Sequence, residues 1–133
     1  MQWRYLDLVD FLLIAEAVLD IPAERLARMG RLGLADSALN APAAGFGAVE
    51  AYPNFERKAA VLCWHLIKNH PLPDGNKRVG FLCLLEFVQR NGRVWRSGQG
   101  DPAETDAIMR GVADGTVGEL GLARWIADRA VEV

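Results

Sequence analysis

The chain has 133 residues, 51% of them apolar, and a formal net charge of −2 at neutral pH. A chain of this length and composition supports one domain with a single hydrophobic core. Because basic and acidic side chains are mixed along the chain, the sequence offers no positive footprint for a phosphate backbone, and we expect no direct nucleic-acid binding.

The first third of the chain predicts short helices followed by a loop. Apolar residues recur every three or four positions over residues 5–19, which is typical of an amphipathic helix, and the acidic residues between them fit neither a signal peptide nor a membrane span. We therefore expect a cytoplasmic protein with no membrane partner. Asp20 ends this helix and is positioned to cap a second one over residues 23–29. A third short helix is expected around residues 34–39, and the breakers and small residues of 41–49 predict an exposed loop or small hairpin.

The middle of the chain predicts two consecutive helices. One covers residues 54–68 and begins with an asparagine in the N-cap position. Prolines in the next segment prevent this helix from continuing, so a tight connection leads to a new helix that starts near Gly75 or Asn76. Residues 79–88 are apolar nearly all round, which favours a position at the centre of the core. The Asn-Gly pair at 91–92 ends the helix.

The last third predicts two more helices. Residues 93–96 are expected to be briefly extended, and Asp101, with Glu104 three residues later, forms a capping pattern for the next helix. An amphipathic helix follows from about residue 119 to near the C-terminus. The elements sum to a single all-α domain over residues 1–133, with six or seven helices and a small β-hairpin.

The two cysteines and two histidines do not form a metal-binding pattern. Cys63 and Cys83 both lie inside strongly apolar segments, which predicts buried free thiols rather than zinc ligands. His65 is interpreted as a packed residue of its helix, and Arg93 and Arg96 as solvated residues of a turn. A site for a hard cation with oxygen ligands stays open.

The residues that indicate chemistry lie in one run, His-Pro-Leu-Pro-Asp-Gly-Asn-Lys-Arg, at positions 70–78. The start of a helix leaves several backbone N–H groups without partners, and the helix dipole favours negative charge there. Lys77 and Arg78 add two cations to that first turn, and Gly75 lets the backbone approach a ligand closely. The Asn76 side chain is expected either to bind a phosphate or to fix the loop. The pattern predicts a polyanion site that suits a nucleotide.

Two further residues of the run predict the reaction. Mg²⁺ is usually held by one or two carboxylates together with substrate phosphates, so Asp74 is the candidate metal ligand. His70 precedes the helix start, where a neutral imidazole can accept a proton from an incoming hydroxyl. These roles predict phosphoryl or nucleotidyl transfer from a nucleoside triphosphate. Taken singly, each residue also fits an ordinary solvated turn or helix cap, and the functional interpretation depends on their occurring together.

The run resembles the motif of the Fic/Doc superfamily, whose Fic branch carries His-Pro-Phe-x-Asp-Gly-Asn-Gly-Arg and whose Doc branch has Asn-Lys-Arg. The similarity extends over most of the chain, from about residue 34 to the Asn-Gly pair at 91–92. The resemblance implies a compact Fic/Doc-type helical domain, with His70 as the catalytic base and Asp74 as the ligand of Mg²⁺. The phosphate-binding residues that it implies are Gly75, Asn76, Lys77 and Arg78.

In this family a flap presents the target protein, a segment of which lines up along the flap as an added strand. By resemblance the flap is the loop 41–49, and its target-docking residues are Gly45, Phe46 and Gly47. One position departs from the family pattern. Leu72 stands where a phenylalanine commonly anchors the motif loop in the core, and we expect the smaller side chain to loosen the loop unless neighbouring residues repack.

Two positions distinguish the branches. Lys77 replaces a glycine of the adenylylating enzymes and Phe81 replaces their second arginine, and both changes favour the Doc branch. The resemblance to that branch implies a toxin that uses Mg²⁺ and ATP, or another nucleoside triphosphate, to transfer the γ-phosphate to a Thr or Ser of a protein. The expected target is translation elongation factor Tu or another translation protein, and the expected partner is a Phd-like antitoxin. Two alternatives stay open: a Fic-type adenylyltransferase, and a catalytically silent antitoxin-binding or regulatory module.

Overall fold

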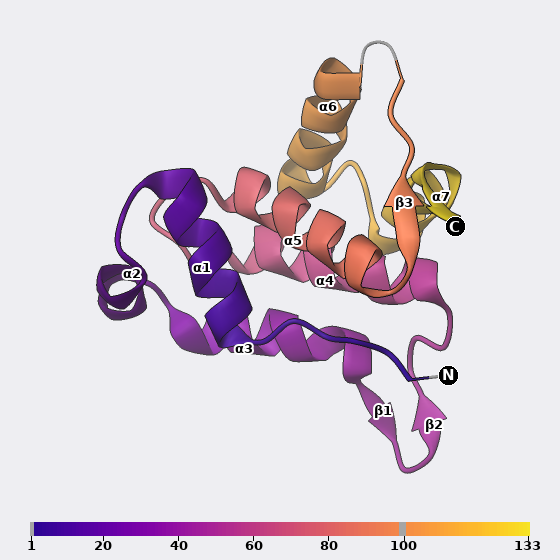
Figure 1. Ribbon diagram of the computed structural model, residues 1–133, viewed down its shortest axis with the longest axis horizontal. Helices are drawn as coiled ribbons and strands as arrows, with labels where there is room; N and C mark the ends of the chain where they lie inside the picture. Colours follow the sequence, from indigo (N-terminus) through magenta and orange to yellow (C-terminus); the bar gives the residue numbers. More distant parts are fainter. Residues whose placement is uncertain (1, 99–100) are drawn as a thin grey trace.

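The computed structural model describes residues 2–98 and 101–133 and confirms a mostly helical, all-α domain (Figure 1). Within that part of the chain there are seven α-helices, one turn of 3-10 helix and two small antiparallel strand pairs. None of the described helices is both long and apolar enough to cross a membrane. In chain order the elements are α1 (Leu8–Leu19), α2 (Ala23–Met29), α3 (Leu32–Asn40), the 3-10 turn η1 (Ala41–Ala43), β1 (Gly45–Phe46), β2 (Val49–Glu50), α4 (Phe55–Asn69), α5 (Asn76–Arg90), β3 (Arg93–Trp95), α6 (Asp101–Asp114), α7 (Glu119–Arg129) and β4 (Ala130–Glu132).

Helix α4 is the central element of the domain (Figure 1). It packs against α3, α5, α6 and α7, and the small residues Ala59, Ala60 and Cys63 are all fully buried in these contacts. The expectation that α5 is the central helix is wrong, because α5 leaves Leu82 39% exposed and Phe81 half-buried. A helix that is apolar nearly all round gives no periodicity from which its open face could be identified.

Helix α1 ends where the sequence predicts, but the residues that cap α1 and α2 differ in part from those expected. The helix begins later than predicted because Asp7 and Asp10 form a capping box, in which each carboxylate accepts the backbone N–H of the other at 2.9 Å. Asp20 ends it in the left-handed conformation, with φ 56°. The prediction that Asp20 also caps α2 is wrong, since the Glu16 carboxylate accepts the Ala23 N–H instead, at 2.7 Å.

Only one of the two strand pairs is predicted by the sequence. β1 and β2 form the expected hairpin, with Gly47 left-handed at its turn (φ 62°). β3 is the expected extended segment, but its antiparallel partner β4 at the end of the chain carries no sequence signal.

The last helix, α7, ends at Arg129, whose guanidinium pairs with Asp101 at 2.7 Å and with Glu104. Glu104 also accepts the indole N–H of Trp125 at 2.9 Å, so it joins α6 to α7 rather than completing a capping box.

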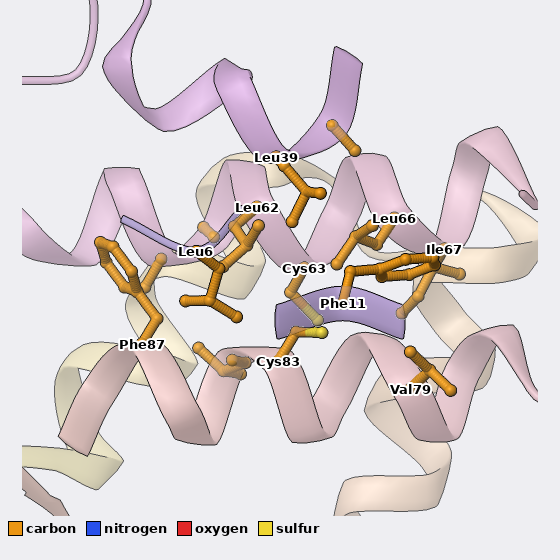
Figure 2. Packing of buried hydrophobic residues seen from close by; sticks show 14 of the residues in the cluster. Leu6, Phe11, Leu39, Leu62, Cys63, Leu66, Ile67, Val79, Cys83 and Phe87 are labelled. Carbon is orange, nitrogen blue, oxygen red and sulfur yellow. The ribbon is translucent and has the colours of Figure 1, made fainter. Parts of the chain in front are cut away.

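The hydrophobic core lies between α4 and α5, where Cys63 and Cys83 face each other (Figure 2). Both thiols are buried and free, as predicted. Burial raises the pKa of Cys83 to about 12 and raises the pKa of Cys63 as well, so both groups are neutral thiols at physiological pH. They therefore pack as small apolar residues of the core.

Candidate active site

The motif run forms the connection between α4 and α5, and a pocket of about 280 Å³ opens on it. Helix α4 is capped by His70 in the left-handed conformation (φ 51°), and α5 follows Gly75, which is also left-handed (φ 73°). The pocket thus brings together all six residues that the sequence predicts for catalysis, metal binding and phosphate binding. Its lining consists of Ile67, His70, Pro73, Asp74, Gly75, Asn76, Lys77, Arg78 and Ala113.

The connection is anchored to the body of the protein from behind. Pro71 is buried, and its carbonyl accepts the backbone N–H of Arg31 at 2.9 Å. Asn69, the last residue of α4, donates its side-chain N–H to the Leu34 carbonyl at 3.0 Å. Leu72 is buried in the hydrophobic core, so leucine occupies the anchoring position that the family fills with phenylalanine. Arg31 and the first turn of α3 therefore fix the inner side of the loop and leave its outer side open.

The Asn76 side chain closes the loop on itself. Its carbonyl oxygen accepts the Leu72 N–H at 2.9 Å, its amide donates to the Leu72 carbonyl at 3.0 Å, and the residue is only 6% exposed. Of the two roles considered for this side chain, the geometry supports fixing the loop. The prediction that Asn76 binds phosphate then depends on its backbone N–H in the first turn of α5.

Gly75 is required by both conformation and space. A Cβ there would lie 2.7 Å from Leu19 Cδ2 and 3.4 Å from Arg78 Nη2, in a backbone conformation that favours glycine. Further along α5, a Cβ at Gly80 would lie 2.9 Å from Ile67 Cγ1. These two glycines let α1 and α4 pack closely against the first turns of α5, and that packing determines where the pocket opens.

Lys77 and Arg78 place two cations at the pocket, and neither has an acidic partner among the described residues. Lys77 and Arg78 are exposed in the first turn of α5, and neither forms an ion pair with a carboxylate of the described residues. No side chain caps the helix start, because the N-cap residue is Gly75. The free N–H groups, the positive end of the helix dipole and both cations therefore favour a ligand with several negatively charged oxygens.

Asp74 supplies the acidic group of the pocket. It is exposed and forms no ion pair with a cation in the described part of the chain. Among residues 2–98 and 101–133 there is no cluster of three or more His, Cys, Asp or Glu side chains that would hold a metal ion alone. This donor set fits Mg²⁺, which needs one carboxylate and completes its shell with phosphate oxygens and waters, and it does not fit zinc.

His70 is exposed at the pocket, where its imidazole can accept a proton from a bound hydroxyl. A left-handed residue after a helix is most often glycine, and a side chain in that conformation costs about 1 kcal/mol. Non-glycine residues held in this conformation are enriched at functional sites. Asp20 ends α1 in the same conformation, so this geometry places His70 at the pocket and its catalytic role stays a prediction.

The predicted docking hairpin does not line this pocket. It lies beside the N-terminal end of α4, whereas the motif connection follows the C-terminal end of the same helix (Figure 1). The fully buried Lys58 holds the hairpin at its base through an ion pair of 2.8 Å with Glu50, while Phe46 is 91% exposed. The structure thus does not bring Gly45, Phe46 and Gly47 to the other predicted residues, and their role in target docking stays a prediction.

The remaining polar residues considered in the sequence are structural. His65 pairs with Glu119 at 3.3 Å and joins α4 to α7, in agreement with its interpretation as a packed residue. Arg93 is not a solvated turn residue, because its guanidinium lies 4.0 Å from the centre of the Phe55 ring. Arg96 is exposed and bonds the end of α7. Neither arginine lines the pocket.

Several residues that shape the pocket are not identified by sequence reasoning. Ala113 comes from the end of α6, far from the motif in the sequence, and no local pattern connects the two. Asn69 and Leu19 act through contacts with other elements, so they also carry no local signal. Gly80 is different, since a glycine inside an apolar helix indicates a close approach of another element.

Comparison with known proteins finds the same family that the motif at residues 70–78 resembles. A family model described as the Fic/DOC family matches residues 5–88, which is more than half of the chain. A curated protein, Toxin Doc of Mycolicibacterium smegmatis, is 38% identical over 81 residues, which are 61% of this chain and 62% of that relative. The chain thus matches less than two thirds of the relative's length. Matches of this extent show that the chain belongs to the Fic/DOC family, in its Doc branch.

Proposed function

We propose that the chain is a Doc-like toxin that transfers the γ-phosphate of ATP to a Thr or Ser hydroxyl of a protein. The proposal depends on one observation: His70, Asp74, Lys77 and Arg78 line the same pocket at the start of α5. A base, a carboxylate suited to Mg²⁺ and two cations are the groups that phosphoryl transfer uses.

The reaction gives each of these residues a task. The acceptor hydroxyl gives its proton to His70 as its oxygen bonds to the γ-phosphorus, and the bond to the β–γ bridging oxygen breaks so that ADP leaves. Lys77, Arg78 and the first N–H groups of α5 stabilise the negative charge on the phosphoryl oxygens. Asp74 would hold Mg²⁺, which when bound supplies further positive charge to the phosphates.

Phe81 supports γ-phosphate transfer over adenylyl transfer. It lies one helical turn beyond Lys77, and its ring packs at 5.6 Å from the Trp95 ring. The family resemblance implies a second arginine at this place in the adenylylating enzymes, where this sequence has Phe81. An aromatic ring offers no positive charge for further phosphates at that place, which favours the γ-phosphate transfer that the resemblance to the Doc branch implies.

Labelled ATP tests the reaction. The chain is incubated with Mg²⁺ and purified elongation factor Tu, which is the acceptor that the family resemblance implies, and with ATP labelled at either the γ- or the α-phosphorus. Label from the γ position on the acceptor, absent with His70→Asn, is the expected result. Label from the α position would identify an adenylyltransferase, and no transfer of either label would favour a binding module.

We also propose that the chain acts in the cytoplasm and is silenced by a Phd-like antitoxin. The printed name of the relative, Toxin Doc, supports the toxin role. Expression of the chain alone should arrest translation and growth, His70→Asn at the same protein level should not, and co-expression of a small protein encoded beside it should restore growth. Unimpaired growth with the active chain would count against a toxin.

A further inference from the structure

A groove leads from the phosphate pocket to the space between α5 and α6. Its first hollow, of about 160 Å³, begins at Lys77 and Arg78, which also line the phosphate pocket. A second hollow, of about 330 Å³, continues from there toward β3. In Figure 1 α6 stands out from α5 on the side of β3. We define the α5–α6 groove by Lys77, Arg78, Phe81, Pro102, Thr105 and Met109.

The chemistry of the groove changes along its length. The end at the phosphate pocket carries both cations, whereas the second hollow has no cation among its described lining residues. Phe81 follows Lys77 by four residues, or about one turn of 5.4 Å along α5. The centre of its ring lies 5.6 Å from that of Trp95, which lines the second hollow beside it, and the Trp95 and Trp125 rings are 5.1 Å apart, so Phe81 belongs to a packed aromatic cluster. The groove thus passes from a cationic surface that suits phosphates to a surface without cations that is largely aromatic and apolar.

The polar groups of the groove are few and differ in availability. Thr105 is half-buried, lines both hollows, and has no hydrogen-bond partner for its hydroxyl within the described residues. Asp106, which also lines the first hollow, pairs with Arg110 at 3.0 Å. In the second hollow Asp101 pairs with Arg129 at 2.7 Å and Ser97 is exposed, so Thr105 is the half-buried hydroxyl that both hollows share. An apolar wall with a few polar groups is typical of sites for small organic ligands.

We propose that the α5–α6 groove binds the nucleoside of the triphosphate, with its base against Phe81 and a polar atom of the nucleoside at the Thr105 hydroxyl. This inference rests on the proposed function, because it requires the phosphates to lie at Lys77 and Arg78. It goes beyond the family similarity, since α6 lies outside the matched residues 5–88.

Isothermal titration calorimetry in the presence of Mg²⁺ distinguishes binding of the nucleoside from binding of the phosphates. ATP and inorganic tripolyphosphate are each titrated into the wild-type chain, Phe81→Leu and Thr105→Trp, without an acceptor protein. Phe81→Leu removes the aromatic face but keeps an apolar side chain against Trp95, and Thr105→Trp fills the groove. Ala107→Trp is the matched control, because Ala107 is exposed on the same helix and lines neither hollow. Circular dichroism verifies that each variant is folded.

The wild-type chain should bind ATP about ten- to a hundredfold more tightly than tripolyphosphate, the gain expected from stacking one base on an aromatic ring. Phe81→Leu and Thr105→Trp should each remove most of this gain and leave tripolyphosphate affinity within twofold, and Ala107→Trp should change neither. Equal affinities for the two ligands, or an ATP affinity that neither variant lowers, would overturn the nucleoside subsite alone. If wild-type protein does not bind tripolyphosphate, the phosphate pocket and the proposed function fail with it.

Discussion

The motif connection, residues 70–75, and the β1–β2 hairpin are the two segments that the family resemblance links to function, and they are held very differently. The connection is fixed by Leu72 in the core, by the Asn76 side chain and by the contacts of Pro71 and Asn69 with Arg31 and the first turn of α3. The hairpin is held at its base through Lys58, and its apolar side chains Phe46 and Val49 face solvent.

This difference in anchoring matches the different requirements of catalysis and of substrate recognition. Bond chemistry requires its groups within about half an ångström of a productive geometry, so a loop that carries a base and a metal ligand benefits from every anchor. Recognition through backbone hydrogen bonds of an added strand tolerates movement and variation. We therefore expect changes at the connection to affect the chemistry, and changes at the hairpin to affect the choice of protein substrate.

The largest effect is expected from removing the base. His70→Asn should lower the rate of phosphate transfer about 10²- to 10⁴-fold, the usual contribution of a positioned general base. Asparagine tolerates the left-handed conformation, so the melting temperature should stay close to that of the wild type. Single-turnover transfer and ATP affinity are measured together. A variant that retains more than a tenth of the rate would show that His70 is not the base.

The next largest effect is expected from removing the two hydrogen bonds between the Asn76 side chain and Leu72. Asn76→Ala leaves the Leu72 N–H and carbonyl without partners in a buried loop, which should lower the free energy of unfolding by about 2–4 kcal/mol. ATP affinity should fall as well, because the start of α5 is displaced. Asn40→Ala is a suitable control, since among the described residues the exposed Asn40 side chain bonds only the Asp36 carbonyl of its own helix α3. If both substitutions lower the free energy of unfolding in urea equally, the Asn76 hydrogen bonds do not stabilise the loop as proposed.

Loosening the hairpin should leave the phosphate pocket intact. Lys58→Met removes a hydrogen bond of 2.9 Å to the buried Pro42 carbonyl and the ion pair with Glu50, and should destabilise the fold by about 1–3 kcal/mol. Hydrogen exchange of residues 41–50 should accelerate, while ATP affinity stays within twofold of the wild type. If ATP affinity falls with hairpin protection, the two segments are coupled and the comparison fails.

The ion pair that joins the start of α1 to the C-terminal end of α5 depends on pH in a defined direction. Hydrogen bonds from Arg90 hold the pKa of Asp10 below its ordinary value of 3.8, against the opposing effect of burial. A carboxyl whose folded pKa is lowered stabilises the fold above about pH 4, and this contribution is lost as the pH falls through the lowered value. Asp10→Asn should therefore cost about 1 kcal/mol at pH 7 and progressively less in acid. A stability difference that is constant from pH 7 to pH 2 would contradict the assignment.

The sequence predicts which motif residues share one pocket better than it predicts the surroundings of that pocket. The residues His70 to Arg78 are contiguous, and helix-start physics explains why phosphates would gather there, so their common pocket follows from local rules. Ala113 and the contacts of Leu19 depend on how distant elements pack, and that information is not local. The same limit explains why α5 is wrongly expected at the centre and why β4 carries no signal: packing and strand pairing are decided by partners far along the chain.

The smallest effect on stability, and the sharpest test of the comparison, concerns the tip of the hairpin. Phe46→Ser should change the free energy of unfolding by less than about 0.5 kcal/mol, because Phe46 is 91% exposed, and ATP affinity should not change. Transfer to a protein acceptor should nevertheless fall several-fold. Val9→Ser is the control, since Val9 is also an exposed apolar residue but lies on α1.

Distance makes this prediction specific. The hairpin and the pocket lie at opposite ends of α4, whose 15 residues span about 22 Å at 1.5 Å per residue. An extended acceptor advances about 3.3 Å per residue, so about seven residues must separate its contact with the hairpin from the hydroxyl at His70. Peptides longer than this should lose transfer on Phe46→Ser, whereas shorter ones, which cannot reach both places, should be modified equally slowly by both proteins. Equal sensitivity of long and short acceptors would mean that the exposed hairpin takes no part in presenting the substrate.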